Sequence, residues 1–171
     1  MQSTQSSRRC LNMFHKLFPS VIDNTFRGKR IALYAFYPIA AVTLIRSCIH
    51  LFALDGGAQT IATIPLDSFS AEVSSVVIGV FALWGLSQLL LGVLYLIASI
   101  WYKSLIPLFY LLLVVEYIGR FAIGHIKPIL TTGTAPGAAL NLPVVILVTI
   151  LLLLSISGTG KKGGLHAERG E

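Results

Sequence analysis

Residues 104–126 form an apolar run that is long enough to cross a lipid bilayer, and this feature constrains the fold more than any other. Three further apolar runs accompany it. We expect membrane-spanning helices at about residues 31–54, 73–100, 104–126 and 140–157. Charged residues make up 12% of the chain, well below the roughly 25% that is typical of soluble domains. The sequence therefore predicts an all-α, polytopic integral membrane four-helix bundle, and it excludes an ordinary cytosolic domain.

Basic residues gather on one side of the predicted spans. Residues 1–30 hold six of the thirteen Lys and Arg, interleaved with apolar residues at three- and four-residue steps. This pattern is typical of a short amphipathic helix at a membrane surface, and a disordered basic arm is an equal alternative. If this segment is cytoplasmic, ten basic residues lie inside (these six, Lys103 and three in residues 158–171) and only Lys127 lies outside. The bias indicates that both termini are cytoplasmic.

The domain organisation follows from these runs. We expect a basic interfacial segment at 1–30, one transmembrane domain at 31–157 and a disordered cytoplasmic tail at 158–171. The Pro- and Gly-containing stretch 125–141 is expected to fold back on the mouth of the bundle as a lid. We place the chain in the inner (cytoplasmic) membrane of a bacterium. The Ser- and Arg-rich start also resembles a mitochondrial transit peptide, which we rank lower.

Ionisable residues inside the predicted spans are the candidate site. Arg46 and His50 are four residues apart in the first span, Glu116 and Arg120 are four apart in the third, and His125 follows at its end. Residues four apart share one face of a helix. At 1.5 Å per residue, Arg46 and Glu116 reach about 22 and about 18 Å from the cytoplasmic edge. We therefore expect the five side chains to converge in the outer leaflet.

Three interpretations of this cluster remain open. Arg46, Glu116 and Arg120 can form a purely structural ion-pair network that selects which helices pack together. They can also line a pocket for a ligand or lipid, or a path for a proton or ion. Two arginines against one glutamate leave a positive charge unless Asp55 neutralises it, and such a pocket favours a phosphate, a carboxylate or a polar quinone head.

Motifs of catalysis are missing from the sequence. It contains no Gly-rich phosphate loop, HExxH, GxSxG or paired CxxC motif, so we expect a protein that is not an enzyme. The sequence leaves the cofactor unknown and indicates no metal. A haem held between His50 and His125 is disfavoured because their expected heights differ. The predicted partners are membrane lipid, a second membrane protein or further copies of this chain. Nucleic acid is not expected, because the basic N-terminus lacks a nucleic-acid-binding fold.

The third span ends in Gly119-Arg120 and is followed by a loop that runs from Lys127-Pro128 to Pro136-Gly137. In this respect the chain resembles small bacterial four-helix membrane proteins of the DoxX-like kind, over about 100 residues and mostly in architecture. The resemblance implies an accessory, quinone-proximal role beside a membrane oxidoreductase. It transfers no catalytic residue to this chain.

Overall fold

The computed structural model describes residue 11 and residues 13–157. The long helices are α2 (Arg30–Phe52), α3 (Ala71–Ile100), α4 (Ile106–Ile126) and α6 (Asn141–Ile156). Shorter helices lie in the connections: η1 (Leu66–Ser68), η2 (Lys103–Leu105) and α5 (Pro136–Ala139). Residues 13–17 are helical as well. The predicted all-α class is confirmed for the described residues, whereas the expected tail at 158–171 and residues 1–10 and 12 lie outside them.

Three of the described helical segments are long and apolar enough to cross a membrane: Arg30–Phe52, Ala71–Ile100 and Lys103–Ile126. Helix α6 is also apolar but has only 16 residues. At 1.5 Å per residue it is about 24 Å long, which is less than the roughly 30 Å of a hydrocarbon core. The structure thus provides three helices of spanning length where the sequence predicted four spans.

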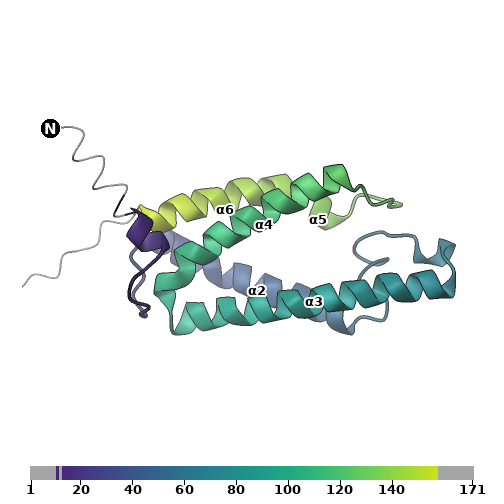
Figure 1. Ribbon diagram of the computed structural model, residues 1–171, viewed down its shortest axis with the longest axis horizontal. Coiled ribbons are helices and arrows are strands. Elements are labelled where there is room, and N and C mark those ends of the chain that lie inside the picture. Colours follow the sequence, from purple (N-terminus) through teal and green to yellow (C-terminus); the bar gives the residue numbers. More distant parts are fainter. Residues whose placement is uncertain (1–10, 12, 158–171) are drawn as a thin grey trace, which may run out of the picture.

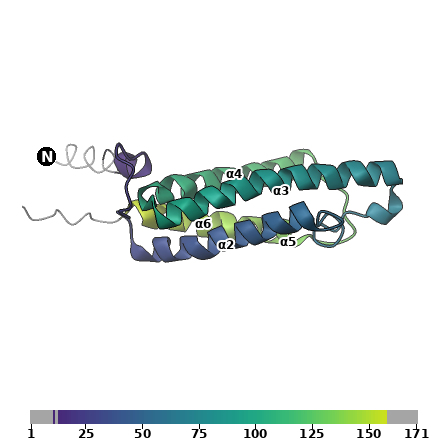
Figure 2. The same cartoon turned by 90° about the horizontal axis from the view of Figure 1, so that it is seen from below.

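The four long helices lie side by side along the long axis of the molecule (Figures 1 and 2). Helix α2 packs mainly on α3, and α4 packs mainly on α6, with fewer contacts between α2 and α6. The start of α2 and the end of α6 lie at the same end of the molecule as residues 13–17 (Figure 1). Helix α3 is the longest, and its first turns extend beyond α4 at the opposite end (Figure 1).

Glycines bring α2 and α3 into close contact. A Cβ atom added at Gly85 would lie 2.8 Å from the Cβ of His50 and 3.0 Å from its carbonyl carbon. A Cβ atom at Gly92 would lie 2.8 Å from Leu44 Cδ2. Small residues allow helix backbones to approach where a larger side chain would hold them apart. The position of α2 against α3 therefore depends on these two glycines.

Aromatic side chains fill the main core, in the half of the molecule that contains the start of α2. Phe36 of α2 contacts the ring of Tyr95 at 5.4 Å and the ring of Tyr110 at 5.3 Å between centroids. All three side chains are fully buried. The Tyr110 hydroxyl donates a hydrogen bond to the Ala32 carbonyl oxygen at 2.7 Å, so its polar atom is satisfied. This cluster joins α2, α3 and α4 at one end.

The connection between α2 and α3 is folded. The Asp55 carboxylate accepts hydrogen bonds from the backbone N–H groups of Gly57, Gln59 and Thr60 at 2.9, 3.1 and 2.8 Å. Gly57 has a φ of 71°, which favours glycine. A small second core follows, formed by Ala58, Ile64 and Leu66, with Val77, Ile78 and Phe81 of α3 packed against it. Residues 53–70 thus form a compact structure on the first turns of α3, which we call the cap.

The residues before α2 are fixed to the ends of the other helices. The Asp23 N–H donates to Ser104 Oγ at 3.0 Å, and the Ser104 N–H donates to the Asp23 carbonyl oxygen at 3.2 Å. The Lys29 N–H donates to the Leu154 carbonyl oxygen at 3.0 Å. Gly28 approaches α6 so closely that a Cβ atom there would lie 2.2 Å from the Ser155 carbonyl oxygen. The entry into α2 is therefore anchored on η2 and α6.

The segment between α4 and α5, expected to act as a lid, contacts the connection between α2 and α3. The Thr132 N–H donates to the Thr63 carbonyl oxygen at 2.9 Å, and Thr63 Oγ1 donates to the Gly133 carbonyl oxygen at 2.9 Å. Residues 127–135 are otherwise largely exposed, and none of them lines the cavity described below.

Candidate functional site

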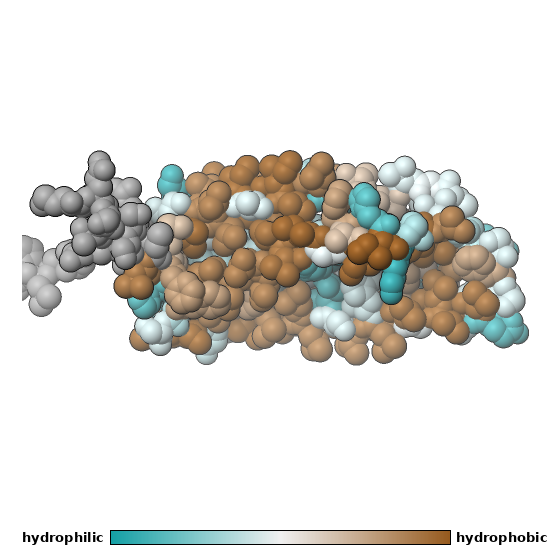
Figure 3. All heavy atoms as spheres, turned by 45° about the horizontal axis from the view of Figure 1, so that its top comes forward, coloured by the Kyte–Doolittle hydropathy of each residue, from teal (hydrophilic) through white to brown (hydrophobic). Residues whose placement is uncertain are grey.

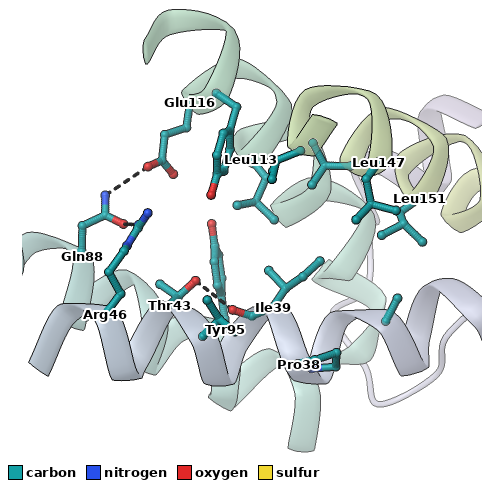
Figure 4. Close-up of a pocket in the computed structure, with 15 residues that line it drawn as sticks. Pro38, Ile39, Thr43, Arg46, Gln88, Tyr95, Leu113, Glu116, Leu147 and Leu151 are labelled. Carbon is teal, nitrogen blue, oxygen red and sulfur yellow. Dashed lines mark hydrogen bonds between the residues drawn. The ribbon is translucent and has the colours of Figure 1, made fainter. Parts of the chain in front are cut away.

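A cavity of about 340 Å³ lies between the α2–α3 pair and the α4–α6 pair (Figure 4). Its walls are mostly apolar. They are formed by Ala35, Pro38, Ile39, Val42, Leu113, Val144, Leu147, Val148 and Leu151. Polar side chains also line it: Thr43, Arg46, Gln88, Tyr95, Glu116 and Tyr117. The cavity lies where α2 faces α6, a pair of helices that pack less extensively than α2 on α3 or α4 on α6.

A chain of hydrogen bonds crosses three helices beside this cavity (Figure 4). Arg46 Nη2 of α2 donates to Gln88 Oε1 of α3 at 3.0 Å. Gln88 Nε2 in turn donates to Glu116 Oε1 of α4 at 3.3 Å. Arg120 Nη1, one turn along α4, donates to the same carboxylate oxygen at 3.2 Å and forms a salt bridge with it. We call these four residues the polar chain.

The polar chain joins its members at one level of the molecule but does not balance their charges. Glu116 pairs with Arg120, and their side chains are 22% and 29% exposed. Arg46 meets Glu116 only through the neutral amide of Gln88. Within the described residues, Arg46 Nε is buried and has no hydrogen-bond partner. An acceptor for this N–H is thus missing, and one positive charge on the polar chain has no carboxylate of its own.

The ring of Trp84 lies close to both arginines of the polar chain. The guanidinium carbons of Arg46 and Arg120 lie 5.6 and 5.1 Å from the centroid of its ring, and Arg120 also lies 5.5 Å from the ring of Tyr117. Cations within about 6 Å of an aromatic face are attracted to it. Trp84 therefore holds two like charges near each other without a second carboxylate.

The two histidines of the predicted cluster lie elsewhere. His50 is buried at 4% exposure, and its Nδ1 lies 2.8 Å from the Gly56 carbonyl oxygen. Because a carbonyl only accepts, Nδ1 carries the proton. The ring lies 4.6 Å from that of Trp84, so His50 contacts the neighbourhood of the polar chain without lining the cavity. His125 is exposed, and its Nδ1 lies 2.8 Å from the Phe121 carbonyl oxygen.

Gln88, Trp84 and Tyr95 are the site residues that the sequence reasoning did not select. They are spaced four and seven residues apart on one face of α3, which is the available signal, but none of them carries a charge. Tyr95 is fully buried, and within the described residues its hydroxyl has no hydrogen-bond partner. In Figure 4 this hydroxyl points away from α2 into the space between the helices.

The cavity has a mixed lining of apolar and polar side chains. Within the described part of the chain, no group of His, Cys, Asp and Glu residues is placed to hold a metal ion. The cavity combines a long apolar wall with polar side chains, among them Arg46 and Glu116. Ligand pockets in proteins commonly have this composition, with volumes of about 300–1,000 Å³.

Comparison with known proteins gives no match: no family model, no curated protein and no solved structure is similar enough to this chain to assign it. The resemblance to DoxX-like proteins therefore stays a prediction.

Proposed function

We propose that this protein is a non-enzymatic integral membrane protein that binds a lipid or a small amphipathic anion in the cavity between α2 and α6. The observation that carries this proposal is the joining of an apolar cavity to a polar chain with an unsatisfied arginine N–H. A wholly structural ion-pair network has no need of such a cavity or of an unused donor. A ligand with an apolar body and an oxygen-rich head satisfies both.

A membrane location is supported by the outer surface of the helices. Large apolar side chains cover much of the face shown in Figure 3. Ile45, Leu83, Val115 and Ile150 are 63%, 68%, 60% and 49% exposed, one on each long helix. Soluble monomers rarely expose continuous apolar surface of this extent. Lipid would cover it, and a membrane-protein partner or a second copy of this chain would cover part of it.

We place four spans in the membrane, with both termini cytoplasmic. Helix α6, the shortest span, is accommodated by local thinning of the bilayer. Arg27, Lys29, Arg30 and Lys103 lie at the end of the molecule where α2 begins, whereas Asp55 and Asp67 lie at the other end. This distribution follows the excess of basic residues on the cytoplasmic side of membrane proteins. The exposed Phe14, Phe18 and Ile22 then face the cytoplasmic membrane surface as the predicted interfacial segment.

The test of ligand binding uses two neighbouring residues of α6. Leu147 lines the cavity and is 51% exposed, whereas Ile146 is 55% exposed and does not line it. The full-length protein is purified in a mild detergent, and bound molecules are extracted and identified by mass spectrometry. We expect Leu147→Trp to lose the co-purifying amphiphile and Ile146→Trp to retain it. Equal amounts in both variants would remove the cavity as the binding site.

A second candidate is a small transporter or channel, favoured by the unbroken hydrogen-bond chain from α2 to α4. Glu116 is the carboxylate on which this chain converges, so its charge is essential to such a path. Proteoliposomes that contain the protein would show ion or proton flux, and Glu116→Gln would abolish it while folding is retained. Absence of flux with the unaltered protein would exclude this candidate.

A further inference from the structure

Two buried donors of the cavity lack acceptors. Arg46 Nε and the Tyr95 hydroxyl are both buried without hydrogen-bond partners in the described part of the chain. Both residues line the cavity, and they come from different helices, α2 and α3. Buried polar groups without partners are uncommon, because each loses its hydration and gains nothing in return. An oxygen-bearing ligand supplies what both groups lack.

The charges of the polar chain favour a ligand with an anionic head group. The single carboxylate of the chain, Glu116, is used by Arg120 at 3.2 Å, and Gln88 meets Arg46 with a neutral oxygen. An anion beside Arg46 would give that guanidinium a charged acceptor, and charge-assisted hydrogen bonds are about twice as strong as neutral ones. Glu116 also lines the cavity, but its carboxylate is paired with Arg120, so Arg46 supplies the charge that would repel a cationic head group.

The shape of the cavity indicates that the apolar part of the ligand is a single chain. Its lining runs along α2 from Ala35 to Arg46, about 16 Å at 1.5 Å per residue. Val42 and Leu147 line it while remaining 62% and 51% exposed, so the cavity opens sideways between α2 and α6. Val148 is 2% exposed and belongs to its inner wall. A volume of about 340 Å³ lies near the lower limit for ligand pockets, which suits one chain better than two.

The order of polar and apolar walls along the cavity matches the orientation of a lipid in the outer leaflet. Arg46 is 16 residues after Arg30, about 24 Å along α2, so it lies in the half of the bilayer away from the proposed cytoplasmic side. From Arg46 the apolar walls continue back past the middle of α2 to Ala35, near its start. A lipid of the outer leaflet has the same direction, with its head outward and its chain toward the midplane.

We infer that the ligand is a single-chain amphiphile with an anionic oxygen head, a carboxylate or a phosphate, that enters from the outer leaflet between α2 and α6. Its head accepts hydrogen bonds from Arg46 Nε and the Tyr95 hydroxyl, and its chain lies along Val144 and Val148 of α6. This inference rests on the proposed function and adds the charge of the head, the number of chains and the route of entry.

The experiment compares probes that differ only in the head or only in the chain. Thermal unfolding of the full-length protein in a nonionic detergent is followed while laurate, dodecanol or acetate is titrated. Laurate is expected to raise the unfolding temperature in a saturable way. Dodecanol needs a concentration at least about tenfold higher, because it cannot form a charge-assisted bond with Arg46. Acetate, which has the charge but no chain, gives no shift.

Variants then locate the effect. Arg46→Gln should bring laurate and dodecanol to the same affinity, and Tyr95→Phe should weaken laurate by several-fold. Lys127→Gln is the matched control, because it removes a positive charge from the same side of the membrane at an exposed residue outside the cavity. It should leave the preference for laurate unchanged. Leu147→Trp should abolish binding of both probes, and Ile146→Trp should not.

The outcomes separate the two levels of the proposal. Equal affinity for laurate and dodecanol in the unaltered protein, with both lost in Leu147→Trp, would overturn the anionic head and leave the ligand cavity in place. This comparison needs no Arg46 variant to fold. A preference for laurate that survives Arg46→Gln would overturn the assignment of the head to Arg46. Binding that is unchanged in Leu147→Trp would overturn both the inference and the proposed function.

Discussion

Gln88 shows how a single neutral residue determines which charges meet. Arg46 and Glu116 lie on different helices, and the amide of Gln88 accepts from one at 3.0 Å and donates to the other at 3.3 Å. An amide is suited to this position because it has an acceptor and a donor side by side. The Gln88 oxygen takes up one N–H of Arg46, at Nη2. Arg46 Nε then stays without a hydrogen-bond partner among the described residues.

We predict that Arg46 and Glu116 are coupled in their contributions to the free energy of unfolding. Arg46→Leu and Glu116→Leu should each destabilise the protein, and the double variant should lose less than the sum of the two. The expected coupling is about 0.5–1.5 kcal/mol, as for other hydrogen-bonded pairs between membrane helices. Unfolding by denaturant in detergent measures it.

The control for this cycle combines Arg46→Leu with Lys127→Leu. Lys127 is exposed at the end of α4 and shares no partner with Arg46, so these two losses should add. Additive losses for Arg46 and Glu116 themselves would mean that Gln88 transmits no energy between the two charges.

Pairs of elements are positioned by glycines and by one carboxylate. Helix α2 lies against α3 because Gly85 and Gly92 have no side chain to separate them. The connection that follows α2 is then held by Asp55, which accepts from three backbone N–H groups. His50 connects the two features, since it lies against Gly85 and its Nδ1–H donates to Gly56. The polar end of the cavity depends on this packing, because Arg46 is one turn before His50.

Two glycines of α3 provide a matched test of that packing. Gly85→Ala should destabilise the protein by roughly 1–3 kcal/mol, because its Cβ would lie 2.8 Å from the Cβ of His50 and the helices must separate. Gly79→Ala is the control, because nothing lies within 4 Å of its added Cβ. It should be neutral or slightly stabilising, since Ala is the better helix former. Equal losses of unfolding temperature in both variants would contradict a contact-specific role.

The contribution of the Asp55 carboxylate to the stability of the protein depends on pH. Burial raises its pKa, but the hydrogen bonds from the backbone N–H groups of Thr60, Gly57 and Gln59 outweigh burial and hold the pKa below the usual 3.8. A carboxyl group with a lowered pKa in the folded state stabilises the protein fully above its unfolded pKa. That contribution is lost as the pH falls from about 4 through the folded value.

Thermal unfolding measured from neutral pH down to about pH 3 tests this group. Asp55→Ala should lower stability by about 1–2 kcal/mol at neutral pH, and it should remove part of the acid-dependent loss. Asp67→Ala is the control, because Asp67 accepts from the side chain of Gln59 and from no backbone N–H in the described structure. An unchanged acid dependence in Asp55→Ala would contradict the assignment.

The two ends of the molecule differ in charge. The end where α2 begins carries Arg27, Lys29, Arg30 and Lys103. It also carries the segment before α2, which is fixed to Ser104 and Leu154. The opposite end carries the acidic cap on the first turns of α3. In the proposed membrane location this asymmetry favours one orientation, with the Arg46 end of the cavity in the outer leaflet.

Labelling of single cysteines tests the orientation in a variant with Cys10→Ser and Cys48→Ser. A membrane-impermeant maleimide should label Ser68→Cys in intact cells, because Ser68 is exposed beside η1 on the proposed outer side. Asn24→Cys, which is exposed at the other end, should be labelled only after the membrane is opened. The reverse pattern would invert the topology and move the cavity to the inner leaflet.

Much of the architecture follows from local sequence properties. Apolar length is enough to predict an all-α chain, because a long hydrophobic segment satisfies its backbone within a helix. The rise of 1.5 Å per residue is enough to place Arg46 and Glu116 at similar heights, and the structure links them through Gln88. The step of four residues likewise predicts that Glu116 and Arg120 share a face, and they form a salt bridge.

Only the tertiary structure decided how each helix is rotated about its axis and which helices leave a space between them. His50 shares a face with Arg46 by spacing, yet close packing at Gly85 places it against the cap, and the neutral Gln88 and Tyr95 take its place at the cavity. Height along a helix depends on residue number alone. Rotation and spacing depend on steric contacts between residues far apart in the chain, and a small side chain such as Gly85 acts there through the room that it leaves.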